Sequence, residues 1–218
     1  MLERFTWFKQ SAYRWDGDGI TVYIDPWGVP EGSPEADAIF ITHAHDDHFQ
    51  PDEIAQLSTK DTQIVAPRNV ADELSGNVQA VAPGDTVEAG GIKGQAVPAY
   101  NIAEERLGMH PKENGWVGYV LHLGDATCYH AGDTDHLPEL ETIDPAVAFV
   151  PIGGTYTMDF SEAAGLVKAI SPQLAVPMHY GYIVGTKDDA ERFRAEADPV
   201  KVEILTPQEP FPPAPVDD

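Results

Sequence analysis

The segment from residue 42 to residue 48, which reads Thr-His-Ala-His-Asp-Asp-His, gathers three imidazoles and two carboxylates into a short stretch. Its His43, His45, Asp47 and His48 follow the pattern H-x-H-x-D-H. Imidazole and carboxylate are ligands that zinc, manganese and iron accept. Two ligands separated by one residue can point to one side of an extended segment, and a following turn can direct the next pair to a second ion. The segment predicts a metal site, and an exposed loop that is only rich in histidine is the less favoured interpretation.

A site for two ions needs further ligands from elsewhere in the chain, and three positions are suitable. They are His110 in a loop, Asp133 just beyond a strand-like stretch, and His179 directly after the apolar run 174–178. Loops and strand exits are places where side chains from different segments can converge on a cleft. These three residues complete the candidate ligand set.

The other histidines and one early aspartate have different interpretations. His122 could replace His110 as a ligand, but it alternates within an apolar stretch and is favoured as a packing residue. His130 is interpreted as a structural residue or an outer contact of a ligand, and His136 as a surface residue near the mouth of the site. Asp25 is either a carboxylate that orients a metal-bound histidine or a turn residue before a proline, and the sequence leaves both open.

Short apolar runs of strand length precede the candidate ligands. The run 38–41 ends before the H-x-H-x-D-H segment, the run 127–130 before Asp133, and the run 174–178 before His179. Strands are expected to outnumber helices. The other predicted strands are 5–8, 11–15, 20–24, 63–66, 78–81, 86–88, 93–99, 117–123, 147–152 and 200–205. The predicted helices are 51–57, 69–74, 161–170 and 188–197.

The amino-acid composition limits the kinds of molecule that the protein is expected to bind. The chain has 36 acidic and 13 basic residues and a formal net charge of -23. Such a field repels polyanions, and the few basic residues are scattered, so a small-molecule substrate is expected and nucleic acid is not. No apolar run approaches the roughly 20 residues that span a bilayer, so no membrane partner is expected. Residues 1–8 lack the apolar core of a signal peptide, and the single cysteine, Cys128, fits a reducing cytoplasm. We expect a cytoplasmic protein, and a homo-oligomer is compatible with the sequence.

One domain is expected over residues 1–205, because no internal repeat or linker divides them. The tail, 206–218, holds five prolines and ends in two aspartates. It is expected to be extended or disordered, with no packing role.

The order of these motifs resembles the ligand series of the metallo-β-lactamase superfamily over nearly the whole chain. Within it, the chain is similar to the branch of metal-dependent hydrolases related to ascorbate-6-phosphate lactonase and to the phospholipase D that cleaves N-acylphosphatidylethanolamine. The matching segments are Tyr-Ile-Asp-Pro at 23–26, the motif at 42–48, Pro-Ala-Tyr-Asn at 98–101, Asn-Gly-Trp-Val-Gly-Tyr at 114–119, Tyr-His-Ala-Gly-Asp-Thr at 129–134, Gly-Gly-Thr-Tyr-Thr-Met at 153–158 and Pro-Met-His-Tyr-Gly at 177–181.

The resemblance implies an α/β fold, the four-layer αββα sandwich, and two divalent metal ions per chain. Zinc is the expected metal, with manganese and iron as alternatives. It implies that a first ion is held by His43, His45 and His110. It implies that a second ion is held by Asp47, His48 and His179, and that Asp133 bridges both. Zinc β-lactamases of the best-known type carry cysteine where this chain has Asp133.

The expected function is hydrolysis of a small-molecule ester, lactone or phosphodiester, because two adjacent divalent ions can hold a shared hydroxide for attack. Asp47 or Asp133 could receive the proton. A metal-binding protein without hydrolytic activity is the alternative, and a nuclease is less favoured. Asp135, outside the ligand series, is expected to be dispensable for metal binding. The pocket candidates, for which core packing is the equal alternative, are Tyr100, Asn101, Tyr156, Met158, Tyr180 and Tyr182.

Overall fold

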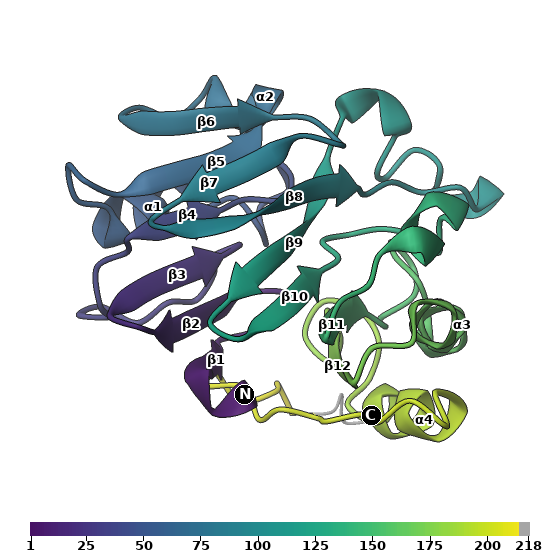
Figure 1. Ribbon diagram of the computed structural model, residues 1–218. Helices are drawn as coiled ribbons and strands as arrows, with labels where there is room; N and C mark the ends of the chain where they lie inside the picture. Colours follow the sequence, from purple (N-terminus) through teal and green to yellow (C-terminus); the bar gives the residue numbers. More distant parts are fainter. Residues whose placement is uncertain (214–218) are drawn as a thin grey trace.

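Two six-stranded sheets pack face to face in the computed structural model, which describes residues 1–213 (Figure 1). The first sheet has the order β1-β2-β3-β4-β5-β6 and the second the order β12-β11-β10-β9-β8-β7. The strands of the first sheet are β1 (Phe5–Trp7), β2 (Tyr13–Gly17), β3 (Ile20–Ile24), β4 (Ala38–Phe40), β5 (Gln63–Pro67) and β6 (Asn77–Val81). Those of the second are β7 (Thr86–Ala89), β8 (Ile92–Pro98), β9 (Val117–Leu123), β10 (Ala126–His130), β11 (Val147–Pro151) and β12 (Leu174–Met178).

The hydrophobic pattern of each strand matches its place in the sheets. Every residue of β4 and β11 is buried, because both faces of these central strands are covered. The edge strand β7 alternates between exposed and buried residues. The β2–β3 hairpin closes through Asp18 and Gly19, whose φ angles of 56° and 80° give the backbone twist that a two-residue hairpin loop requires.

Helices cover the outer face of each sheet and complete four layers. α1 (Pro51–Leu57) and α2 (Arg68–Ala71) bury Ile54, Leu57 and Val70 in a cluster with residues of the first sheet. α3 (Phe160–Ile170) and α4 (Asp189–Glu196) lie beside β11 and β12 of the second sheet (Figure 1). Short 3-10 helices are η1 (Leu2–Arg4), η2 (Glu104–Arg106), η3 (Lys112–Asn114) and η4 (Pro138–Thr142). The αββα prediction is confirmed.

Two predicted elements are wrong in extent. The predicted strand 200–205 contributes only one isolated bridge, between Val202 and Ala175, because only the backbone around this residue reaches β12. The predicted helix 69–74 is shorter, since α2 ends at Ala71 and the next residues form a turn.

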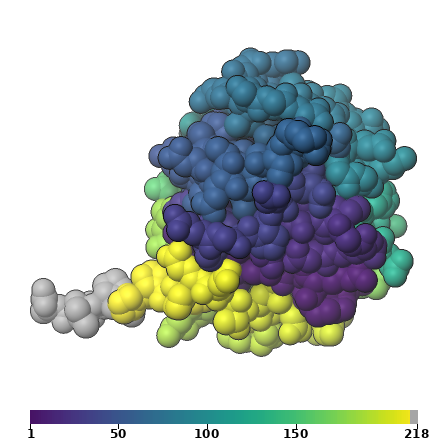
Figure 2. Space-filling model, turned by 90° about the vertical axis from the view of Figure 1, so that its left-hand side faces the viewer, coloured from purple at the N-terminus to yellow at the C-terminus, as the bar shows by residue number. Residues whose placement is uncertain are grey.

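The described part of the tail, 206–213, packs against the N-terminal segment, so the expectation of no packing role is wrong for it (Figure 2). The backbone nitrogens of Gln208 and Glu209 donate to the carbonyls of Trp7 and Phe8 at 2.7 and 3.1 Å. Phe211 lies against the rings of Trp7, Tyr180 and Tyr182. An aromatic side chain therefore fixes a tail whose prolines cannot form regular structure. Residues 214–218 lie outside the described part.

Replacing Phe211 by alanine tests this packing. Because the ring is only partly buried, Phe211→Ala is expected to lower the free energy of unfolding by about 1–2 kcal/mol, less than a fully buried phenylalanine would cost. Denaturant unfolding measures the change. Pro213→Ala, at an exposed tail position, is the control and should leave the midpoint unchanged. Equal midpoints for both variants and the wild-type protein would show that the tail does not stabilise the fold.

Candidate metal centre

The candidate ligands lie at one end of the sandwich, where strands of both sheets terminate. β4 leads into the H-x-H-x-D-H segment, β10 into Asp133 and β12 into His179. β10, β11 and β12 are mutually parallel, so their carboxyl ends share an edge. The backbone nitrogen of Val117 donates to the carbonyl of Thr42 at 3.1 Å, which joins the two sheets at this end. Parallel strand direction thus brings residues far apart in sequence to one place.

The first group of candidate ligands is His43, His45 and His110, which offer nitrogen atoms within 4.8 Å of one another. His43 Nε2 and His45 Nδ1 are 3.1 Å apart. The ring of Trp116 lies 5.0 Å from the rings of both His43 and His45. Its packing restricts the motion of these imidazoles, a role that the sequence motif did not indicate.

The second group is Asp47, His48 and His179, which also offer atoms within 4.8 Å of one another. Asp47 Oδ2 is 3.4 Å from His179 Nε2 and 3.7 Å from His48 Nε2. A third such group, formed by His43, His48 and Asp133, overlaps the other two, so the seven candidate ligands surround one centre.

Asp133 lies between the two groups. Its Oδ2 is 3.3 Å from His110 Nε2 in the first group and 3.1 Å from His179 Nε2 in the second, and its Oδ1 is 3.3 Å from His48 Nε2. Gly132 makes this approach possible, since its φ is 62° and a Cβ there would lie 3.0 Å from Thr42 and from the Val117 carbonyl. One carboxylate thus faces both groups, as a bridging ligand must.

Outer hydrogen bonds orient the imidazoles. His48 Nδ1 lies 2.7 Å from Asp25 Oδ2, His43 Nδ1 lies 2.9 Å from Thr42 Oγ1, and His110 Nδ1 lies 2.8 Å from Asn101 Oδ1. Asp25 also accepts from the backbone nitrogen and the hydroxyl of Thr42. Of the two interpretations of Asp25, the structure favours the carboxylate that orients a candidate ligand.

The donor atoms fit a cation. His48 Nε2, His110 Nε2 and Asp133 Oδ1 are buried and have no hydrogen-bond partner. Buried polar atoms without a partner are rare and costly in folded proteins. Nitrogen and oxygen donors turned towards one another, with their outer sides already hydrogen-bonded, suit divalent transition metals.

A cavity of about 330 Å³ opens above these ligands. Its lining residues are His45, Asp47, Met109, His110, Asp133, Tyr156, His179 and Ile183. Of the predicted pocket residues only Tyr156 lines it. Candidate ligands thus form one part of the lining and bulkier side chains the rest.

The other pocket predictions need correction. Tyr100 donates from its hydroxyl to Glu139 Oε1, and Asn101 is buried beneath His110. Met158 and Tyr180 belong to the hydrophobic core, and Tyr182 packs on Phe211. Packing, the equal alternative in the sequence, applies to these side chains.

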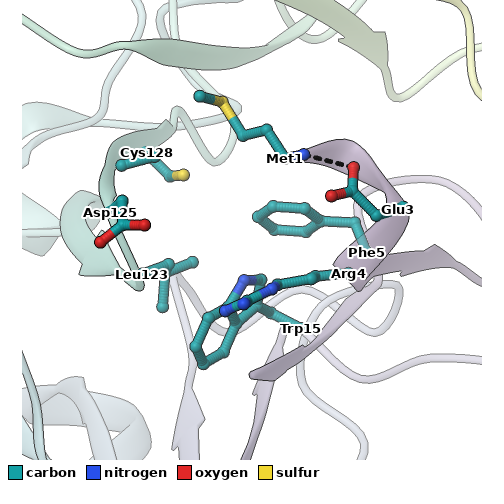
Figure 3. Close-up of a pocket in the computed structure, with 9 residues that line it drawn as sticks. Met1, Glu3, Arg4, Phe5, Trp15, Leu123, Asp125 and Cys128 are labelled. Atoms are coloured by element: carbon teal, nitrogen blue, oxygen red, sulfur yellow. Dashed lines mark hydrogen bonds and ion pairs between the residues drawn. The ribbon is translucent and has the colours of Figure 1, made fainter. Parts of the chain in front are cut away.

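A second cavity, of about 210 Å³, lies at the opposite end of β10, between η1 and the β9–β10 turn (Figure 3). Phe5, Trp15 and Cys128 line it, and Glu3 pairs with the terminal amine. Burial raises the pKa of Cys128 to about 12, so this thiol is not a nucleophile at neutral pH. No histidine lines this cavity, and the chemistry belongs to the first one.

The remaining histidines lie apart from the candidate ligands. His122 is exposed on β9, so its expected packing role is wrong, and it is not near the ligand groups either. His130 is buried with Nε2 2.9 Å from the Ser11 carbonyl, a structural role. His136 pairs with Glu141 and does not line the cavity above the ligands.

Comparison with known proteins places the chain in a family. The family model described as a beta-lactamase superfamily domain matches residues 4–179. A UPF0173 metal-dependent hydrolase of Methanopyrus kandleri is 33% identical over 228 residues, which cover 95% of this chain and 99% of the relative. The chain belongs to the metallo-β-lactamase superfamily. The prediction of a metal-dependent hydrolase of this superfamily is confirmed.

Solved structures of metal-dependent hydrolases support the assignment. A protein of Parabacteroides distasonis, assigned as a metal-dependent hydrolase, has a TM-score of 0.84 and 31% identity, with 94% of this chain and 93% of the other covered. A metallo hydrolase of Ignicoccus hospitalis has a TM-score of 0.75 and 25% identity, with 94% and 95% covered. Within residues 1–213, this metal-dependent hydrolase has no helix with the length and apolar content needed to cross a bilayer.

Three residues at or next to the candidate ligands of this hydrolase have a left-handed backbone conformation. Gln10, Asp25 and His179 have φ angles of 48°, 46° and 55°, in a region that residues other than glycine rarely adopt. The His179 nitrogen donates to the Gln10 carbonyl, and Gln10 Nε2 donates to Asp47 Oδ2 at 3.3 Å. Gln10 therefore positions two candidate ligands. Sequence reasoning missed it because a glutamine in an N-terminal loop carries no recognisable signal.

The segment 101–110, here called the His110 arm, is anchored by Asp135. Asp135 is buried and accepts hydrogen bonds from Asn101 Nδ2, from the backbone nitrogens of residues 102 and 103, and from Arg106 Nε, all between 2.7 and 2.9 Å. Asn101 in turn accepts from the backbone nitrogen of His110 and contacts its ring. These contacts connect Asp135 to His110 through the arm, a connection that the sequence did not indicate.

The charges of the candidate ligands around Asp133 affect one another's pKa values. Burial alone would raise the pKa of Asp133, but the attraction of His179 and His48 holds it well below its ordinary value. Burial alone would lower the pKa of His179, but Asp133 and Asp47 raise it to about 9. Burial lowers the pKa of His43 well below its ordinary value. Without metal, therefore, a proton on His179 compensates the carboxylates, and an ion must displace it.

This coupling predicts how pH affects protein stripped of metal by a chelator. The pKa of His179 rises from 6.5 to about 9 on folding, so its stabilisation is complete below pH 6.5 and is lost as the pH rises through 9. The free energy of unfolding is expected to fall by about 3 kcal/mol between these limits, as measured by urea titration. With saturating zinc the decline should vanish. A stripped protein whose stability is constant or increases over this range would contradict the assignment.

The Asp135 anchor predicts a selective defect. Asp135→Asn replaces an acceptor oxygen with a donor, and the His110 arm should lose its fixed position. The affinity of the ion held by the first group is expected to fall about tenfold to a hundredfold, while the ion of the second group is retained. Chelator competition with metal analysis measures both. Asp144→Asn, at an exposed position, is the control. Equal loss of both ions, or of neither, would contradict the anchoring role.

Proposed function

We propose that the chain is a two-metal hydrolase that cleaves a small-molecule ester, lactone or phosphodiester. The observation that carries this proposal is the pair of ligand groups that share Asp133 beneath a cavity. In the proposed assignment His43, His45 and His110 hold one ion, and Asp47, His48 and His179 hold the other. Zinc is the expected metal, and manganese or iron would also suit these donors.

Two divalent ions supply a hydroxide at neutral pH and polarise the oxygen of a scissile carbonyl or phosphoryl group. Asp47 is the better placed of the two carboxylates to receive a proton during the reaction. Both carboxylates line the cavity, but the Asp47 side chain is 17% exposed, whereas that of Asp133 is 3% exposed and is enclosed by imidazoles. Asp133 therefore acts mainly by compensating the charge of both ions, and Asp47 by accepting the proton.

The electrostatics support a small substrate. The chain carries a net charge of -23, and no lysine or arginine is among the lining residues of the cavity in the described part of the chain. A polyanion would have no counter-charge at the mouth. A volume of about 330 Å³ is suited to a small molecule.

Metal analysis and the Asp133→Asn variant test this proposal. The wild-type protein is expected to bind about two divalent ions per chain. Asp133→Asn should lose at least one ion and reduce hydrolysis by orders of magnitude, because the compensating charge is removed while the shape remains. A panel of lactones, esters and phosphodiesters supplies the activity readout.

Asp46→Asn is the matched control, since Asp46 is exposed in the same loop and outside both ligand groups. It should retain two ions and full activity. A single ion in fully active wild-type protein, or two tightly bound ions with near-full activity in Asp133→Asn, would overturn the proposal. Two bound ions without hydrolysis of any substrate would favour a metal-binding protein instead.

A further inference from the structure

Exposed apolar side chains occur on two segments that carry candidate ligands. Among residues 1–213, five large hydrophobic side chains are exposed, and one of them is the N-terminal Met1. The other four are Ile102, Leu107 and Met109 on the His110 arm, and Ile183 in the loop that follows His179. Single exposed apolar residues are ordinary on protein surfaces, but a group confined to two loops beside a site is not.

Two of these side chains belong to the cavity itself. Met109 is 42% exposed and Ile183 is 53% exposed, and both line the cavity together with Tyr156. Met109 directly precedes His110 in the first ligand group, and Ile183 lies four residues beyond His179 in the second. The cavity therefore has donor atoms on one side and an apolar wall contributed by two separate loops.

Two cations on or next to the His110 arm, Arg106 and Lys112, already have acidic partners. Arg106 is buried and pairs with Asp135 and Glu162. Lys112 donates to Tyr100 Oη and pairs with Glu139. A second anionic group on a substrate would thus find no partner beyond the metal ions, and its desolvation would be uncompensated.

We propose that the site selects carboxylic esters or lactones that carry an uncharged alkyl or aryl group, seated against Met109, Ile183 and Tyr156. This inference rests on the proposed function and narrows it. A phosphodiester brings a full negative charge that other enzymes neutralise with arginine or lysine as well as metal, and the lining supplies neither. A neutral ester with a hydrocarbon chain matches both the donor side and the apolar wall.

Alkyl hydroxamic acids test the apolar wall without requiring hydrolysis, because the hydroxamate group chelates divalent ions while the chain extends into the cavity. The affinity of zinc-loaded protein for acetohydroxamic, hexanohydroxamic and octanohydroxamic acid is measured by calorimetry. We expect the affinity to rise about threefold to fourfold per methylene until the wall is covered. Suberic acid monohydroxamate, which ends its chain in a carboxylate, should bind at least tenfold more weakly than octanohydroxamic acid.

Single substitutions test which side chains contact the alkyl chain of the hydroxamate. Ile183→Asn and Met109→Gln should each weaken the binding of octanohydroxamic acid about tenfold, with the zinc content of every variant measured alongside. Leu107→Asn is the matched control, because Leu107 is 50% exposed on the same arm but does not line this cavity, and it should bind as the wild type does.

An affinity that is independent of chain length, equal binding of the carboxylate-ended chain, or wild-type binding in both lining variants would overturn this inference. Failure of every ester, lactone and phosphodiester to be hydrolysed would instead overturn the proposed function. The hydroxamate series does not depend on turnover, so the two failures are distinguishable.

Discussion

The buried Asp133 carboxylate, faced by ring nitrogens of several histidines, is the interaction on which the rest of the site depends. A carboxylate away from water is costly unless positive charge compensates it. His48, His110 and His179 bring Nε2 atoms within 3.3 Å of its oxygens. Removal of the carboxylate or of the histidines would leave the remaining charge buried without an opposite charge beside it, so the candidate ligands behave as one unit. Protons on His179 and His48 can satisfy this unit at low pH, and cations can satisfy it when those protons are displaced.

The sandwich positions this unit by ending strands of both sheets at one edge. His43, Asp133 and His179 follow the ends of β4, β10 and β12 within a few residues, which limits the freedom of their backbone. Asp25, Thr42 and Asn101 then fix the outer nitrogens of three imidazoles, so their inner nitrogens face the centre. The left-handed backbone of His179 and Gln10 persists because packing around it is strong enough to hold an unfavourable conformation.

The two loops beside the cavity share one design, an anchored base and an exposed tip. Asp135 and Arg106 fix the base of the His110 arm, while Met109 remains exposed. Phe211 of the tail packs against Tyr182 in the other loop, while Ile183 remains exposed. The anchors keep the ligands in place, and the tips are free to contact whatever enters. In the proposed function, the anchored bases hold the metal ligands and the apolar tips contact the substrate.

The sequence by itself predicted a metal site, because the H-x-H-x-D-H spacing places imidazole and carboxylate donors close together. The order of the motifs along the chain resembled the metallo-β-lactamase superfamily, and that resemblance implied the αββα architecture that the structure has. Only the tertiary structure decided which residues position the candidate ligands and which side chains line the cavity. Asp135 and Gln10 became positioning residues through partners about 30 and 40 residues away in the chain, and such contacts leave no local pattern. Tyr100, Met158 and Tyr180 turned inwards rather than to the cavity, because an aromatic or apolar residue near a motif satisfies core and pocket equally well until neighbouring strands are placed.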